Sequence, residues 1–197
     1  MSKKKRWAPR KCVVHCETTR KDLPTDKNSA AGKILDVAHA ALDLGFSVIS
    51  SQTLVIASSV ADLVEKVLAE TSEYGFDRLA IVDHSIMYVD KKGKPVAVAM
   101  HVGSDTLSGT NISQFSKELA RLDSALTDDA EVKIVNCFVA ADPVLHKGLA
   151  KAIKRPVIAG LGLTSGLGLT NDAGFFRADP DGTVKAVTTL GTGKLSF

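Results

Sequence analysis

Short apolar runs alternate with segments of helical periodicity along most of this chain. The runs have the length and the β-branched content of buried strands. They are KCVVHC (11–16), FSVIS (46–50), TLVIA (53–57), RLAIVDH (78–84), EVKIVN (131–136) and RPVIAG (155–160). TLVIA either continues the preceding strand through a bend or forms a second short strand. Strands that alternate with helices in this way predict a mostly parallel sheet with helices on both faces.

The segments between these strands carry helix-capping residues and an apolar stripe of helical period. Four helices are predicted: 28–44, capped by Asn28 or Ser29 and stopped by Gly45; 59–75, capped by Ser59 with Asp62 and ended by Gly75; 111–126, capped by Asn111 with Gln114; and one that begins at Asp142-Pro143. Two hairpins complete the pattern. They are IMYVDKKGKPVAVAMHVG (86–103), turning at 91–94, and GFFRADPDGTVKAVTTL (174–190), turning at 179–182.

Composition favours a single domain preceded by a basic tail. The sequence has 197 residues, of which 45% are hydrophobic, enough for one full core. Its net charge of +3 comes from the first eleven residues, which carry six cations and no acid, whereas the remainder has 19 cationic and 22 acidic residues. We expect residues 1–11 to form a disordered basic tail and residues 12–197 to form the domain. The tail could alternatively touch nucleic acid or an anionic membrane.

Several classes of protein are disfavoured by the same numbers. No apolar run reaches membrane-spanning length and no secretory leader is evident, so we expect a cytoplasmic protein. Three cysteines, an odd number, indicate reduced thiols. Aromatic residues make up 5% of the sequence, too few for a base-stacking surface, so no specific nucleic-acid partner is expected. The oligomeric state stays open.

Two motifs have features of cofactor-binding sites, but neither matches a metal site or a nucleotide-binding loop. Cys12, His15 and Cys16 have a spacing seen in metal sites, but a strand would point His15 away from both sulfurs. The run GLGLTSGLGLT (160–170) lacks the Lys-Ser/Thr ending of a nucleotide-binding loop. We therefore expect no metal and no organic cofactor, and interpret the glycine run as a flexible or substrate-lining loop.

A histidine and a cysteine stand at the ends of two predicted strands. His84 ends RLAIVDH, and Cys137 directly follows EVKIVN. If these strands are parallel neighbours, an imidazole and a thiol reach one sheet edge, where α/β proteins bind ligands. The predicted helix at Asp142 could favour the thiolate through its positive end. Spacing alone equally allows Cys137 to be a buried small apolar residue and His84 a hydrogen-bonded polar one.

The segment from His84 to Cys137 resembles the caspase-like (clan CD) superfamily of cysteine peptidases, in which these two residues lie about fifty residues apart. It is most similar to a bacterial caspase-like domain family of uncharacterised function found in large surface proteins. That family has a strand ending in His-Gly, a glycine-containing stretch, a helix Phe/Tyr-x-x-Glu-Leu-Ala-x-Leu and a strand ending in Gly-Cys-x-Val-Ala. The matching segments are LAIVDHS, HVGSDTLSGT, FSKELARL and EVKIVNCFVA, within roughly residues 75–160.

The resemblance implies a three-layer caspase/hemoglobinase fold and a defined set of site residues. His84 would be the general base and Cys137 the nucleophile. The main-chain N–H groups of Ser85 and Cys137 would form the oxyanion hole. Two positions depart from the family pattern, because Ser85 stands in place of a glycine and Asn136 in place of a small residue.

The expected function is therefore a cysteine peptidase or a related acyl-transfer hydrolase that acts on a peptide or protein substrate. The hairpin at 86–103, the segment 103–109 and the glycine-rich loop would shape the substrate groove. The two departures favour an alternative from another class, a caspase-like pseudoenzyme that serves as a binding or assembly module. A third interpretation, nucleotide or nucleic-acid binding through the tail and the glycine loop, would require stabilisation by phosphate.

Overall fold

The computed structural model of the protein describes residues 10–16, 52–89, 91, 95–164, 170–187 and 193–194. Several predicted features lie outside these residues. They are nearly all of the basic tail, the helix 28–44, the strand 46–50, most of the 91–94 turn and the middle of the glycine-rich run.

Seven strands form one mixed sheet, in the order β2-β1-β3-β7-β8-β10-β11. Their bounds are β1 Lys11–Cys16, β2 Gln52–Ala57, β3 Phe76–Val82, β7 Leu126–Val135, β8 Val157–Gly160, β10 Phe175–Ala178 and β11 Val184–Ala186. The first five strands in this order run parallel, whereas β10 pairs antiparallel with both β8 and β11. The mostly parallel α/β sheet predicted from the sequence is thus confirmed, and TLVIA lies within the single strand β2.

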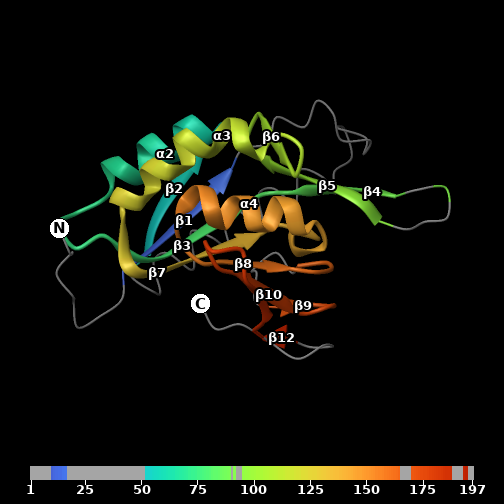
Figure 1. Cartoon of the computed structure of the whole chain (residues 1–197). Coiled ribbons are helices and arrows are strands. Elements are labelled where there is room, and N and C mark those ends of the chain that lie inside the picture. The colour runs from blue at the N-terminus through green and yellow to red at the C-terminus, as the bar shows by residue number, and fades with distance from the viewer. Residues whose placement is uncertain are drawn as a thin grey trace, which may run out of the picture.

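A second, antiparallel sheet follows β3 in sequence and extends away from the body of the molecule (Figure 1). It consists of β4 Ser85–Val89, β5 Pro95–Val102 and β6 Asp105–Ser108, in that order. The hairpin predicted over 86–103 corresponds to β4 and β5, whereas β6 was not predicted. The short strands β9 Thr170–Asn171 and β12 Gly193–Lys194 pair with each other. The predicted hairpin at 174–190 is confirmed by the antiparallel pairing of β10 with β11.

The helical segments are α2 Val60–Ala69, α3 Ile112–Leu119, the 3-10 turns η1 Ala120–Ser124 and η2 Val139–Ala141, and α4 Pro143–Ile153. α2, α3 and α4 begin where the sequence predicts, although one of the three predicted side-chain caps is absent. Ser59 Oγ accepts from the N–H of Asp62 at 3.1 Å, and Asp142 Oδ1 accepts from the first-turn N–H groups of α4, as predicted. Asn111, however, does not cap α3. Its side chain instead accepts from the Ser108 N–H at 2.7 Å and donates to the Thr106 carbonyl at 2.8 Å.

Two helices also end earlier than predicted. α2 stops at Ala69, where the Thr71 hydroxyl donates to the Val67 carbonyl at 2.7 Å and occupies a carbonyl of the last turn. Gly75, the predicted stop, instead takes a φ of +68° in the turn that leads into β3. The 111–126 helix is α3 followed by η1, so its periodicity continues while its hydrogen bonding tightens.

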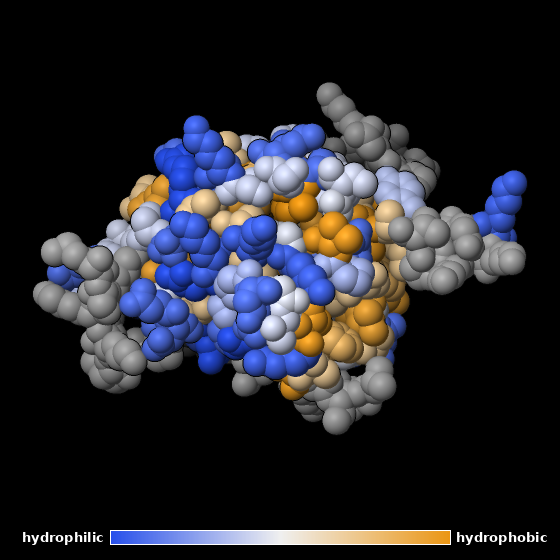
Figure 2. Space-filling view, viewed as in Figure 1, coloured by the Kyte–Doolittle hydropathy of each residue, from blue (hydrophilic) through white to orange (hydrophobic). Residues whose placement is uncertain are grey.

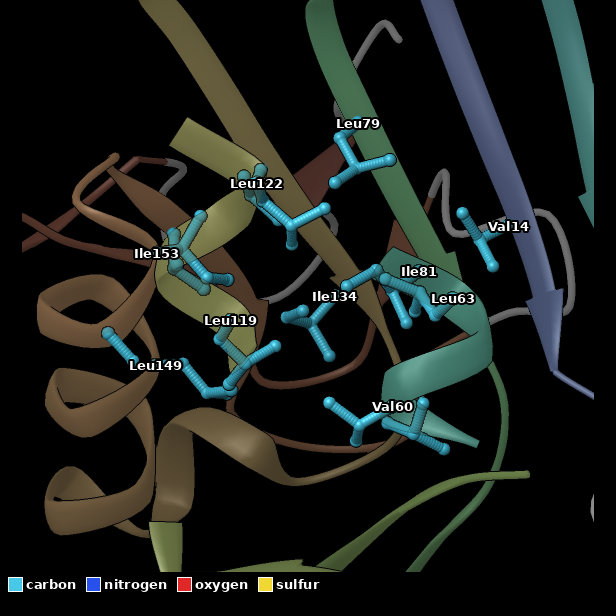
Figure 3. Close-up of a cluster of buried hydrophobic side chains, with 14 of the residues drawn as sticks. Val14, Val60, Leu63, Leu79, Ile81, Leu119, Leu122, Ile134, Leu149 and Ile153 are labelled. Atoms are coloured by element: carbon cyan, nitrogen blue, oxygen red, sulfur yellow. The ribbon is translucent and has the colours of Figure 1, made fainter. Parts of the chain in front are cut away.

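One face of the main sheet carries every helix that the described residues contain. Side chains of β1, β3 and β7 on this face pack against α2, α3 and α4 in a continuous core, as Figure 3 shows for Val14, Leu79 and Ile134. The opposite face presents a smaller apolar group: Val13, Ala80, Val82 and Val135, with Leu54. The helix predicted for the second face, 28–44, lies outside the described residues. Within those residues, no helix combines the length and the apolar character needed to cross a membrane.

Candidate active site at the carboxyl edge of the sheet

The pairing of β3 with β7 brings His84 and Cys137 to the same edge of the sheet. The two strands are parallel neighbours, with Val82 opposite Val135 at their carboxyl ends. Immediately beyond them, Asn136 Nδ2 donates a hydrogen bond to the His84 carbonyl oxygen at 2.8 Å. His84 and Cys137 are neither fully buried nor fully exposed. The convergence of strand ends predicted from the sequence is therefore present.

The sulfur of Cys137 lies against the loop that follows β8. The main-chain N–H of Thr164 donates to Cys137 Sγ at 3.4 Å, and the thiol lies 3.9 Å from the Thr164 carbonyl oxygen. The next residue, Phe138, has a φ of +62°, and its N–H donates to the Gly162 carbonyl at 2.8 Å. This left-handed turn ends β7 sharply and leaves Cys137 at the bend. The Cys137 thiol therefore faces both an N–H donor and a carbonyl acceptor of Thr164.

Two part-buried hydrogen bonds of the Thr164 side chain hold the loop after β8 in place. Thr164 Oγ1 donates to the Asn136 carbonyl at 3.2 Å and accepts from Asn171 Nδ2 at 3.0 Å. Asn171, 2% exposed, also accepts from the Gly162 N–H at 3.0 Å. A Cβ at Gly160 would lie 2.1 Å from Asn171 Nδ2, so only glycine leaves room for this amide. The described part of the glycine-rich run therefore supports Cys137, and its N–H groups at 162 and 164 are already engaged.

The His84 main chain is held on both sides. Its N–H donates to Asp83 Oδ1 at 2.7 Å, and the other carboxylate oxygen of Asp83 accepts from the Gly103 N–H at 2.9 Å. Its carbonyl accepts from the N–H of His101 at 2.9 Å as well as from Asn136. These contacts fix the corner between β3 and β4 that carries His84.

Only one of the three cysteines has surroundings suited to a nucleophile. Burial raises the pKa of Cys12 to about 12, with a further contribution from Glu70. Burial, and next the charge of Asp83, also raise the pKa of Cys16. Cys12 and Cys16 are 0% and 3% exposed, whereas Cys137 is part-exposed. Because reactive cysteines are accessible thiolates, Cys137 is the candidate.

The structure does not support stabilisation of the Cys137 thiolate by the start of α4, which the sequence suggested. The Asp142 carboxylate accepts from the N–H groups of Val144 and Leu145, each at 3.0 Å. The amides that would face an anion are thus occupied, and the cap brings a negative charge of its own. We assign Cys137 its N–H donor from Thr164 instead.

Apolar side chains are exposed near this edge. Val144, in the first turn of α4, is 63% exposed, and Leu163, next to Thr164, is 57% exposed. Figure 2 shows hydrophobic surface toward the end of the molecule from which β4 and β5 project. Within the residues that the structure describes, no group of three or more His, Cys, Asp or Glu side chains could hold a metal ion. Cys12, His15 and Cys16 accordingly form no such group.

Sequence patterns alone missed Thr164, Asn171 and the contact made by Asn136. Thr164 follows β8 closely at the carboxyl edge, so its position could have marked it. Asn171 carries no comparable signal, because it lies seven residues beyond Thr164 in the sequence. Asn136 stood out only as a departure from the family pattern.

A scan against protein-family models found no match for this protein, and a search of the curated proteins found none either.

Proposed function

We propose that this protein is a caspase-like cysteine peptidase, or a related acyl-transfer hydrolase, with Cys137 as nucleophile and His84 as general base. The observation that carries the proposal is the meeting of the β3 and β7 ends, joined by the 2.8 Å hydrogen bond between Asn136 and the His84 carbonyl. A thiol and an imidazole on one accessible sheet edge are the minimal parts of a thiolate nucleophile. The resemblance of residues 75–160 to caspase-like domains supports the same assignment.

The reaction would proceed in two steps. The Cys137 thiolate attacks the peptide carbonyl carbon and forms a C–S bond, and the C–N bond breaks as the His84 imidazolium gives its proton to the leaving amine. Water then attacks the thioester while His84 takes its proton, and the carboxylic acid leaves as the thiolate is regenerated. The Thr164 N–H, 3.4 Å from Sγ, would stabilise the thiolate at the start and the end of this cycle.

The negative oxygen formed in each step needs donors, and the main-chain N–H groups of Ser85 and Cys137 would supply them. The serine in place of the family's glycine is compatible with this role. Among the described residues, positive φ values occur outside glycine only at Phe138 and Lys154. Ser85 therefore keeps a backbone conformation open to any L-residue, and its hydroxymethyl group causes no backbone strain at the site.

The test is peptide cleavage by the native full-length protein. We expect incubation with a proteome-derived peptide library to produce new peptide termini, detected by mass spectrometry, and we expect Cys137→Ala to produce none. Cys12→Ala serves as the matched control, because this second cysteine lies on β1 inside the core. Its cleavage products should equal those of the unmodified protein. Absence of cleavage by the native protein, or equal cleavage by Cys137→Ala, would refute the proposal and favour a binding module.

A further inference from the structure

One peptide plane at the site is fixed by hydrogen bonds to its carbonyl group. The His84 carbonyl oxygen accepts from the His101 N–H at 2.9 Å and from Asn136 Nδ2 at 2.8 Å. The same Nδ2 lies 3.4 Å from the His101 carbonyl oxygen. Because both neighbours are carbonyl oxygens, which only accept, they require the NH₂ end of the Asn136 amide at this place. The orientation of the amide is therefore set by its surroundings.

This carbonyl determines the direction of the Ser85 N–H. The two groups belong to one trans peptide unit, in which C=O and N–H point in opposite directions. The strand pairing leads to the same direction for the Ser85 N–H. In an antiparallel pair hydrogen-bonded and non-hydrogen-bonded positions alternate, so the bond between His101 and His84 makes Ser85 and Met100 a non-hydrogen-bonded pair. The Ser85 N–H thus points away from β5, along the edge of the small sheet.

We propose that Asn136 is a positioning residue that aims the Ser85 N–H at the oxyanion. The proposal rests on the function proposed above. Asn136 does not touch the substrate. It holds the His84 carbonyl, and this fixes the Ser85 N–H, which points in the opposite direction within the same peptide plane. Because the next residue is Cys137, one position links the nucleophile to its oxyanion donor.

The burial of Asn136 supports a role beyond folding. This residue is 1% exposed, and Oδ1 has no hydrogen-bond partner among the described residues. Burying an unpaired carbonyl costs about 1–3 kcal/mol. The small residue found in the caspase-like pattern would avoid this cost but could not reach the His84 carbonyl. The departures at 85 and 136 are thus connected, because the amide at 136 fixes the peptide that begins residue 85.

Two reagents distinguish an effect on the direction of the oxyanion donor from an effect on the reactivity of the Cys137 thiol. A peptide aldehyde, built on a sequence that the native protein cleaves, adds to Cys137 and forms a tetrahedral oxygen that needs the Ser85 N–H. Iodoacetamide alkylates Cys137 with loss of iodide and forms no such oxygen. For Asn136→Leu and Asn136→Ala we expect aldehyde inhibition to weaken roughly 10- to 100-fold. We also expect kcat to fall by a similar factor. The KM and the rate at which iodoacetamide alkylates Cys137 should not change.

Each other outcome is decisive. Unchanged aldehyde inhibition in both variants overturns the role of Asn136 and leaves the proposed function standing. Equal losses in aldehyde inhibition and alkylation overturn it as well, because they show that Asn136 only maintains the Cys137 loop. A native protein that cleaves no peptide removes the proposed function, and this inference with it. Far-UV circular dichroism identifies a misfolded variant, and the second substitution then gives the result.

Discussion

Replacement of His84 by alanine is expected to lower the rate of peptide cleavage by about 10²- to 10⁴-fold, the usual contribution of a general acid-base residue. In the proposed reaction the imidazole draws the proton from Cys137 and returns one to the leaving amine in the first step, and it takes a proton from water in the second, so its loss slows both steps. The variant should fold, because the contacts that fix this corner use the main chain of residue 84. Its N–H bonds Asp83, and its carbonyl accepts from His101 and Asn136.

His101→Ala is the matched control for this experiment. This second histidine lies on β5 beside the same corner, and its ring Nδ1 lies 3.3 Å from Thr106 Oγ1. Its contribution to the corner, the N–H donated to His84, belongs to the backbone and survives the substitution. We expect cleavage by His101→Ala to stay within a few-fold of the native rate. A loss confined to His101→Ala, with His84→Ala active, would transfer the general base to His101.

Gly103→Ala is expected to destabilise the fold by roughly 2 to 5 kcal/mol in urea unfolding. The glycine has a φ of +60°, and an added Cβ would lie 2.2 Å from both the carbonyl carbon and the carbonyl oxygen of the Ser58 backbone. The left-handed conformation costs an L-residue about 1–2 kcal/mol, and overpacking against a backbone that cannot move adds about 1–3 kcal/mol. The clash would push the β5-β6 turn away from the end of β2, where the Ser104 N–H now donates to the Ser58 carbonyl at 2.8 Å.

Gly182→Ala separates the two causes. Gly182 also has a positive φ, +89°, but nothing lies within 4 Å of its added Cβ. Only the conformational cost applies there, so we expect a loss of about 1–2 kcal/mol. The Gly103 variant should also lose activity, since its N–H holds Asp83 beside His84. Equal destabilisation by the two substitutions would show that contact with Ser58 is not what restricts residue 103.

Hydrophobic periodicity predicted most of the framework because it reports directly which side chains are buried. β1 matches the run KCVVHC, with Cys12, Val14 and Cys16 in the large core and Val13 on the opposite face. Alternation of strands and helices also predicted parallel neighbours, which was enough to place His84 and Cys137 on one edge. These inferences depend only on local spacing and on the geometry of parallel sheets.

Hydrophobic periodicity did not predict the contacts made by polar side chains. Asn111 has the sequence position of a cap, yet its amide bonds Thr106 and Ser108, which the unpredicted strand β6 brings near. Asn136 bonds a carbonyl 52 residues away in sequence, and no periodicity records that partner. The polar side chains on which the proposed site depends are therefore the ones that local patterns left open.

A crystal structure of the native protein after reaction with a substrate-derived peptide aldehyde tests the central claim most directly. We expect electron density to join the peptide to Cys137 Sγ, with the adduct oxygen facing the N–H groups of Ser85 and Cys137 and the His84 imidazole within hydrogen-bonding distance of the adduct. Attachment at another residue, or an adduct oxygen directed away from both amides with His84 remote from it, would contradict the proposed catalytic site.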